Sequence, residues 1–99
     1  MRMTTSVLKV LSVFLSATDE MSGAEIAEIT KLATGTLYPI LIRLEEQGWL
    51  KSQWEEGDPK KLGRPRRRFY RITGLGARSA RREIGRLKDA LGRAAWGTS

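Results

Sequence analysis

Cysteine and histidine are both absent from the 99 residues of the sequence. Without cysteine the chain has no disulfides, thiolate chemistry or sulfur-ligated metal. Without histidine it lacks the commonest metal ligand and the commonest general base near neutral pH. Glu45 and Glu46 are adjacent acids, but no base, nucleophile or metal ligand accompanies them, so a catalytic role is not expected. These absences predict a protein that is not an enzyme and that binds no metal or cofactor.

Long hydrophobic runs are also missing. No apolar segment approaches the roughly 20 residues of a membrane-spanning helix. Only Arg2 precedes the first apolar segment, and no small-residue cleavage site follows it, so we expect neither a membrane partner nor a signal peptide. The length predicts one domain with a modest core, and the 40% of apolar residues argues against disorder. A cytoplasmic protein is the simplest interpretation.

Basic charge, in contrast, is abundant and concentrated. Residues 60–71 contain seven lysines and arginines and no acid, and the formal net charge of the whole chain is also +7. The rest of the chain is therefore neutral. Basic charge concentrated in one segment is typical of a surface that meets phosphates, and a merely solvated charged segment is the alternative.

A helix-turn-helix is predicted ahead of the basic segment. Ser22 and Glu25 have the spacing of a capping box for a short helix over residues 23–30. After a turn, Thr34 is a suitable N-cap for a helix over residues 35–47. Gly48 is expected to end this helix in the left-handed conformation. Its predicted core stripe consists of Leu37, Ile40, Leu41 and Leu44.

The helices at the two ends of the chain carry further apolar surface. Residues 4–17 are apolar around most of the helix, which indicates burial on two sides, either by the same chain or by a second subunit. From Thr73 onward a narrow apolar stripe is predicted, of the width that seats one partner helix. The helix begins with Gly74 and Gly76, which predicts a loss of about 1 kcal/mol or more in helix propensity.

Two strands are predicted between the third and the last helix, over residues 50–55 and 66–72, where apolar and polar residues alternate. The Gly- and Pro-rich segment between them is expected to be neither helix nor strand. Together these residues predict a long hairpin with a basic tip and a basic return strand. Trp54 in the first strand is expected to pack on the sheet.

The order of these elements predicts a winged helix-turn-helix, a mainly α (α+β) fold with an extra C-terminal dimerisation helix. Residues 1–76 are the expected DNA-binding domain, and residues 77–99 the dimerisation helix and tail. In this fold the third helix enters the major groove of double-stranded DNA and the hairpin is the wing. Hydroxyl and apolar groups on the helix and cations on the wing suit such contacts. The residues concerned are Thr34, Thr36, Tyr38, Pro39, Ile42, Lys60, Lys61, Arg64, Arg66, Arg67 and Arg68.

The sequence also resembles a known family. The run TGTLYPILIRLEEQGWLKSQWEE, followed by GRPRRRFYRIT, is similar to the signature of the PadR family of transcriptional regulators. The resemblance covers roughly residues 22–76. A Tyr-Pro pair inside the recognition helix, with Gly-Arg-Pro-Arg on the following wing, is more specific than a generic helix-turn-helix pattern.

The resemblance implies a homodimeric DNA-binding repressor in which the last helix contacts the first helix of the partner subunit. It implies DNA contacts from Thr34, Thr36, Tyr38, Arg43, Arg64 and Arg66, with Gly35 on the same outward face of the helix. The dimer interface implied in this way comprises Val7, Leu8, Leu11, Ala80, Ile84, Leu87 and Leu91.

Two alternatives stay open at this point. Trp96 is more typical of an exposed or interface tryptophan than of the aromatic residue that lines a ligand pocket in some multidrug-responsive relatives, and a small-molecule effector is left open. The alternative function is a winged-helix module that binds an acidic protein partner, such as another regulator, through its basic wing.

Overall fold

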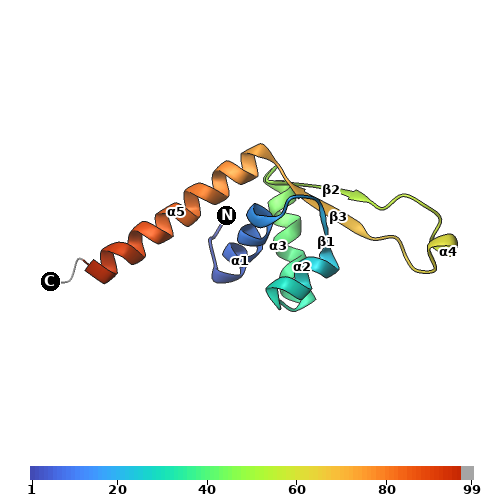
Figure 1. The fold of residues 1–99 in the computed structure, drawn as a ribbon, viewed down its shortest axis with the longest axis horizontal. Helices are drawn as coiled ribbons and strands as arrows, with labels where there is room; N and C mark the ends of the chain where they lie inside the picture. The colour runs from blue at the N-terminus through green and yellow to red at the C-terminus, as the bar shows by residue number, and fades with distance from the viewer. Residues whose placement is uncertain (97–99) are drawn as a thin grey trace.

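The molecule is elongated, with a small helical core between a projecting hairpin and a projecting C-terminal helix (Figure 1). Its principal extents are 64, 25 and 22 Å. The structure is a computed structural model that describes residues 1–96. Its elements are α1 (Thr5–Ser16), β1 (Met21–Ser22), α2 (Gly23–Thr30), α3 (Thr34–Glu46), β2 (Leu50–Trp54), α4 (Pro59–Leu62), β3 (Arg68–Ile72) and α5 (Gly74–Trp96). The predicted winged helix-turn-helix architecture is confirmed.

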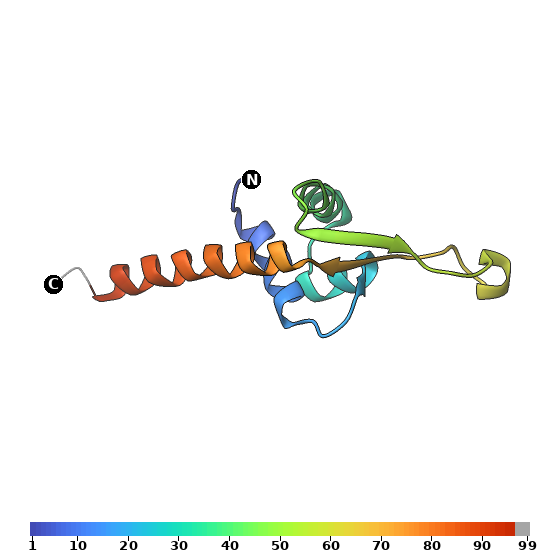
Figure 2. The same cartoon turned by 90° about the horizontal axis from the view of Figure 1, so that it is seen from above.

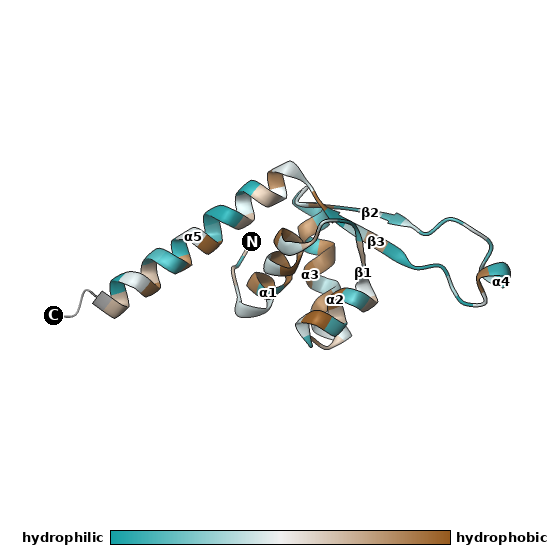
Figure 3. Ribbon diagram, viewed as in Figure 1, coloured by the Kyte–Doolittle hydropathy of each residue, from teal (hydrophilic) through white to brown (hydrophobic). Residues whose placement is uncertain are grey.

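The core lies around α1, which packs against α2, α3 and α5. α1 buries Val7, Val10, Leu11 and Phe14 within its own chain, while Leu8 and Val13 on another side of the helix are only half-buried. The predicted stripe of α3 is buried as well. Apolar residues gather on α1, α2 and α3, whereas α5 and the hairpin are mainly hydrophilic (Figure 3). Among the described residues, none of the helices combines the length and the apolar character needed to cross a membrane.

The helix-turn-helix begins with the predicted cap on α2. The Ser22 hydroxyl accepts a hydrogen bond from the Glu25 amide at 3.2 Å. The Glu25 carboxylate in turn accepts from the Ser22 hydroxyl rather than from the amide that a capping box uses. The turn leaves α2 through Lys31, whose φ of 60° lies in the left-handed region.

The predicted N-cap of α3 is wrong by one residue. Ala33 is the N-cap and no side chain caps the helix, while Thr34 is the first helical residue. The Ala33 carbonyl accepts from the amides of Thr36 and Leu37. An alanine cannot satisfy the remaining orphan amides, so the N-terminus of α3 presents free N–H groups and the positive end of the helix dipole.

The other end of α3 matches the prediction closely. Gly48 has a φ of +77°, its amide donates to the Glu45 carbonyl, and the Trp49 amide donates to the Leu44 carbonyl at 2.9 Å. These two bonds form a Schellman motif. The motif turns the chain directly into β2, which fixes the hairpin next to the recognition helix.

The sheet is antiparallel with strand order β1-β3-β2. Leu50, Ser52 and Trp54 of β2 lie opposite Ile72, Tyr70 and Arg68 of β3. Because side chains alternate along a strand, these six residues share one face, toward α3. The two-residue strand β1 was not predicted. It pairs with β3 through Met21 and Ser22 and is too short for any alternation to be seen.

The hairpin tip contains a helical turn, so the prediction that this segment is neither helix nor strand is wrong for Pro59–Leu62. α4 is a single turn in which the Asp58 carboxylate accepts from the Lys60 amide, and Gly63 ends it with a φ of +72°. Pro59 occupies a first-turn position, where a proline costs no helical hydrogen bond. Pro59 therefore begins this turn and Gly63 ends it, although proline and glycine are usually helix breakers.

α5 runs without interruption across the predicted division at residue 76 and projects away from the core, opposite to the hairpin (Figure 2). Its first half packs on α1, where Ala80 is completely buried. Beyond this region Leu87 and Leu91 are 42% and 60% exposed. The side chain of Trp96, which was considered for an effector pocket, lies outside the described residues.

Candidate nucleic-acid interface

One groove joins the recognition helix to the hairpin. It has a volume of about 560 Å³, and its walls come from the start of α2, from α3 and from both strands of the hairpin. The residues that line it are Ser22, Gly23, Ala24, Tyr38, Ile42, Glu45, Trp54, Pro65, Arg66, Arg67, Arg68 and Tyr70. The Tyr-Pro helix and the basic return strand therefore face the same concave surface, which one ligand can contact from both sides.

The wall formed by α3 is built from residues that its core stripe leaves outside. Thr34, Gly35, Thr36, Pro39 and Arg43 are all exposed. Tyr38 and Ile42, one turn apart on the helix, are 40% and 55% exposed and both line the groove. The 3.6-residue period that buries Leu37, Leu41 and Leu44 thus presents hydroxyls, a guanidinium and an apolar side chain outward.

The wing supplies four exposed cations. Lys60, Lys61, Arg66 and Arg67 are exposed, and within residues 1–96 none of them lies within 4.0 Å of a carboxylate. Lys60 and Lys61 lie on α4 at the tip, and Arg66 and Arg67 line the groove closer to α3. These four side chains offer unpaired positive charge along the length of the hairpin.

Arg64 is engaged within the chain instead. Its Nη1 and Nη2 donate to the two carboxylate oxygens of Glu55 at 2.6 and 2.9 Å. Glu55 also accepts from the Arg67 amide at 3.3 Å, and its own amide donates to the Arg67 carbonyl. A bidentate arginine–carboxylate pair fixes geometry as well as charge. Arg64 therefore braces the two arms of the wing against each other.

The pairing with Arg64 lowers the pKa of Glu55 below its ordinary value of 4.5, mainly through the side-chain hydrogen bond. A group whose folded pKa is depressed adds its stability above the unfolded pKa and loses it as the pH falls through the folded pKa. We expect the Arg67 amide resonance in an NMR titration to follow this protonation, with a midpoint below 4.5. In Arg64→Gln the midpoint should return toward the ordinary value, and equal midpoints in the two proteins would contradict the brace.

Arg68 is held by a second network at the base of the wing. Its Nη2 lies 3.5 Å from the Glu45 carboxylate, and its guanidinium lies 5.2 Å from the ring centroid of Trp54. Both oxygens of Glu45 accept from the Ser52 hydroxyl, at 2.7 and 2.8 Å. Glu45 thus connects α3 to both strands of the hairpin. Trp54 thus contacts the side chain of its cross-strand neighbour on the sheet, while 58% of it stays exposed.

The residues that position this interface were not predicted from the sequence, namely Gly23, Glu45, Ser52 and Glu55. Glu45 lies seven residues from Ser52, and Glu55 lies nine from Arg64, so no local spacing rule connects either pair. The floor of the groove is Tyr70, whose burial raises the pKa of its hydroxyl. No group of three or more histidine, cysteine or acidic side chains in the described part of the chain converges as metal ligands would.

The residues implied for a dimer interface fall into two groups. Val7, Leu11 and Ala80 are buried within the single chain, so their side chains have no surface left for a partner. Leu8 and Ile84 are half-buried, and Leu87 and Leu91 are exposed. The apolar surface still free is therefore limited to the second group.

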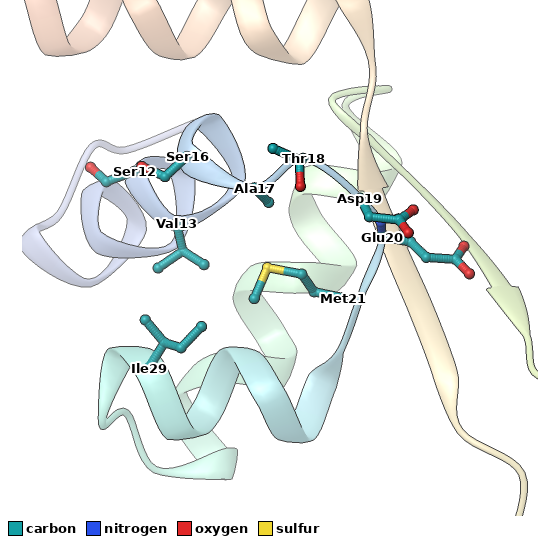
Figure 4. A pocket seen from close by; sticks show the side chains of 9 residues that line it. All are labelled: Ser12, Val13, Ser16, Ala17, Thr18, Asp19, Glu20, Met21 and Ile29. Carbon is teal, nitrogen blue, oxygen red and sulfur yellow. The ribbon is translucent and has the colours of Figure 1, made fainter.

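A groove along α1 adjoins this surface. One part of it, about 550 Å³ in volume, lies between α1 and α2, where Val13, Met21 and Ile29 point into a common space (Figure 4). A second part of about 630 Å³ shares Ser12, Val13 and Ile29 with the first and extends to Leu8 and Leu87. The two parts adjoin at these shared residues, and their apolar lining includes Met3, Leu8, Val13, Met21, Ile29 and Leu87.

Comparisons with known proteins agree with this geometry. Residues 17–82 match the model of the transcriptional regulator PadR-like family. A PadR family transcriptional regulator from Eggerthella lenta has a similar structure, with a TM-score of 0.72 and 29% identity over 96% of this chain and 84% of that chain. A Streptococcus mutans protein gives a TM-score of 0.71 and 26% identity over 100% and 97% of the two chains.

Regulators outside this family have a similar fold. A MarR family regulator from Rhodococcus has a TM-score of 0.76 at 18% identity, over 98% of this chain and 64% of that chain. At such an identity the likeness concerns the fold alone. Among curated proteins, no sequence matches this chain.

Proposed function

Because the chain belongs to the transcriptional regulator PadR-like family, we propose that it is a homodimeric repressor that binds specific sites in duplex DNA. In this proposal α3 enters the major groove and the wing lies along the sugar–phosphate backbone or in the adjoining minor groove. The observation that carries the proposal is the single groove whose walls are Tyr38 and Ile42 of α3 and Arg66 and Arg67 of the wing.

The two walls have different roles in this proposal. Thr36, Tyr38 and Arg43 offer donors and acceptors to base edges, and Pro39 and Ile42 offer apolar contact to thymine methyl groups. Lys60, Lys61, Arg66 and Arg67 bind phosphates, because each is exposed and unpaired in the described chain. The free amides at the start of α3 add a further phosphate contact. Arg64 acts on DNA mainly through the wing that it braces, since a direct contact would cost its pair with Glu55.

The experiment that tests the function is selection from a random duplex library, followed by affinity measurements on the enriched site. We expect a two-fold symmetric sequence with half-sites roughly 10 bp apart. If a dimer makes about 6–10 phosphate contacts, its affinity should fall by roughly 10³–10⁵ between about 50 and 200 mM salt. Enrichment of no sequence, or binding insensitive to salt, would favour the alternative in which the wing meets an acidic protein.

The dimer proposed here uses the C-terminal half of α5. Leu87 and Leu91 continue the stripe of α5 toward its C-terminus and stay 42% and 60% exposed, and Leu87 lies in the wall of the groove that also contains Leu8. The groove along α1 has Leu8, Val13 and Ile29 in its walls, and these apolar side chains can pack against leucines of a second subunit. We propose that α5 of each subunit occupies this groove of the other, which makes the interface isologous and closed.

Leu91→Ser tests this interface. The substitution removes two leucines from each dimer, and at about 1 kcal/mol of burial for each we expect the dimer dissociation constant to rise about 30-fold. Analytical ultracentrifugation over a concentration series measures it. Asp89→Ser, on the opposite side of the same exposed helix segment, is the matched control and should leave the constant unchanged. Identical monomer–dimer behaviour of the two variants would remove α5 from the interface.

A further inference from the structure

Gly23, the first residue of α2, lies directly beneath the side chain of Tyr38. A Cβ atom at Gly23 would lie 2.6 Å from the Tyr38 hydroxyl oxygen, 3.0 Å from Cε1 and 3.1 Å from Cζ. Real Cβ atoms essentially never approach a neighbour to 2.6 Å, so any other residue at this position would displace the tyrosine ring. The ring of a recognition-helix residue thus rests on the backbone of the preceding helix.

The glycine is not needed for the path of the chain. Gly23 is not among the residues with positive φ, and α2 begins there with a side-chain cap already provided by Ser22. Alanine is the better helix former, so neither backbone conformation nor helix propensity favours glycine at this position. What distinguishes Gly23 is the space it leaves for Tyr38.

This space determines where Tyr38 points. A tyrosine has only two side-chain torsions, and here one side of the ring is covered by Gly23 while 40% of the side chain stays exposed at the groove. Gly23 therefore limits the positions that the ring can take before any ligand binds. A contact whose side chain is already ordered loses less conformational entropy on binding than one that must be ordered then.

We propose that Gly23 is a positioning residue for sequence recognition, because it holds Tyr38 in the orientation that reads the DNA. This inference rests on the proposed function and adds a residue of α2 to the specificity determinants carried by α3. Since the clash involves the far end of one side chain, Gly23→Ala leaves the fold intact and moves the ring. We therefore expect the substitution to change the preference for DNA sequence and not the stability of the protein.

The experiment measures the affinity of the full-length protein for its selected site and for a shuffled duplex of the same length. In Gly23→Ala we expect the ratio of the two affinities to fall about tenfold, the size of one lost base contact. Affinity for the shuffled duplex and its salt dependence should match the wild type. Gly85→Ala is the matched control, because a Cβ at that helical glycine meets nothing within 4 Å.

A double-mutant cycle separates positioning from other roles of Gly23. Tyr38→Ala alone should lower the ratio as much as Gly23→Ala does, and combining the two should cost nothing further, because the clash no longer exists. If Gly23→Ala fails to fold, the double variant should still fold and match Tyr38→Ala. The Tyr38 ring resonances should shift in Gly23→Ala without DNA.

The outcomes are distinguishable. A wild-type protein that selects no duplex overturns the proposed function itself. A wild-type protein that selects DNA, with Gly23→Ala showing the same ratio, overturns the role of Gly23 alone. A loss caused by Gly23→Ala that persists in the Tyr38→Ala background also overturns it, because Gly23 would then act without the tyrosine.

Discussion

Gly76→Ala is expected to lower the free energy of unfolding by about 3 kcal/mol and the melting temperature by roughly 12–24 °C. A Cβ at Gly76 would lie 2.1 Å from the carbonyl oxygen of Trp49 and under 3 Å from its carbonyl carbon and Cα. Backbone atoms cannot rotate aside as the end of a side chain can. The first turn of α5 must therefore move away from the turn that follows α3.

That movement would break a set of hydrogen bonds at one junction. The Thr73 amide donates to the Trp49 carbonyl at 2.9 Å, and the Thr73 hydroxyl donates to the carbonyls of Gly48 and Trp49. The Gly76 amide in turn donates to the Thr73 hydroxyl, which caps α5. Helix propensity favours alanine by about 1 kcal/mol, which is too little to offset the clash.

Gly74→Ala is the matched control for this substitution. It makes the same change two residues earlier in the same helix, where the nearest atom is Nη1 of Arg78 at 3.3 Å. Because that atom is the end of a flexible side chain, Gly74→Ala should be neutral or slightly stabilising. Urea denaturation followed by circular dichroism measures both. Equal stabilities would mean that α5 can shift at this junction without cost.

The role of Gly76 could not be predicted from the sequence. From the sequence, both glycines at the start of α5 were expected only to weaken the helix. The expectation is correct for helix propensity alone. In the folded chain, however, only a residue without a side chain fits beside the carbonyl of Trp49, 27 positions earlier. A propensity scale contains no such contact, because it describes each residue apart from its tertiary neighbours.

Features with local signals were predicted well. The bounds of α2 and the Gly48 Schellman motif follow from rules that need only a few neighbouring residues. β1 could not be predicted, since two residues show no period. α4 was excluded because its Pro and Gly were interpreted as breakers, although each has a favourable place in a single capped turn.

The features of the candidate site also fall into those that the sequence predicts and those that it does not. The exposed face of α3 follows from the period of its core stripe, and the basic segment is evident from composition. The ion-pair partners of the arginines are not evident from the sequence. Arg64 and Arg68 look like Arg66 and Arg67 in the sequence, yet only the first two meet carboxylates, those of Glu55 and Glu45. Strand register and the packing of α3 decide which arginines stay free.

That distinction leads to the largest expected effect on DNA binding. Arg66→Gln combined with Arg67→Gln removes the two groove arginines that are free of carboxylates in the described chain. In a dimer four guanidinium groups are lost, and at about 0.9 per phosphate contact the salt dependence should become shallower by about 3–4. At about 150 mM salt this slope corresponds to a loss of roughly 10³-fold in affinity for every duplex.

The double variant should keep its wing. Glu55 binds the side chain of Arg64 and the main-chain amide of residue 67, and none of these groups is altered by the two substitutions. Arg81→Gln with Arg82→Gln is the charge-matched control, because it removes two exposed arginines from α5 and gives the same net charge. If only the overall positive charge attracts DNA, both variants should weaken binding equally. If Arg66 and Arg67 contact phosphates, the wing variant should lose far more DNA affinity than the control. This loss should be equal on the selected and the shuffled duplex, because phosphates carry no sequence information.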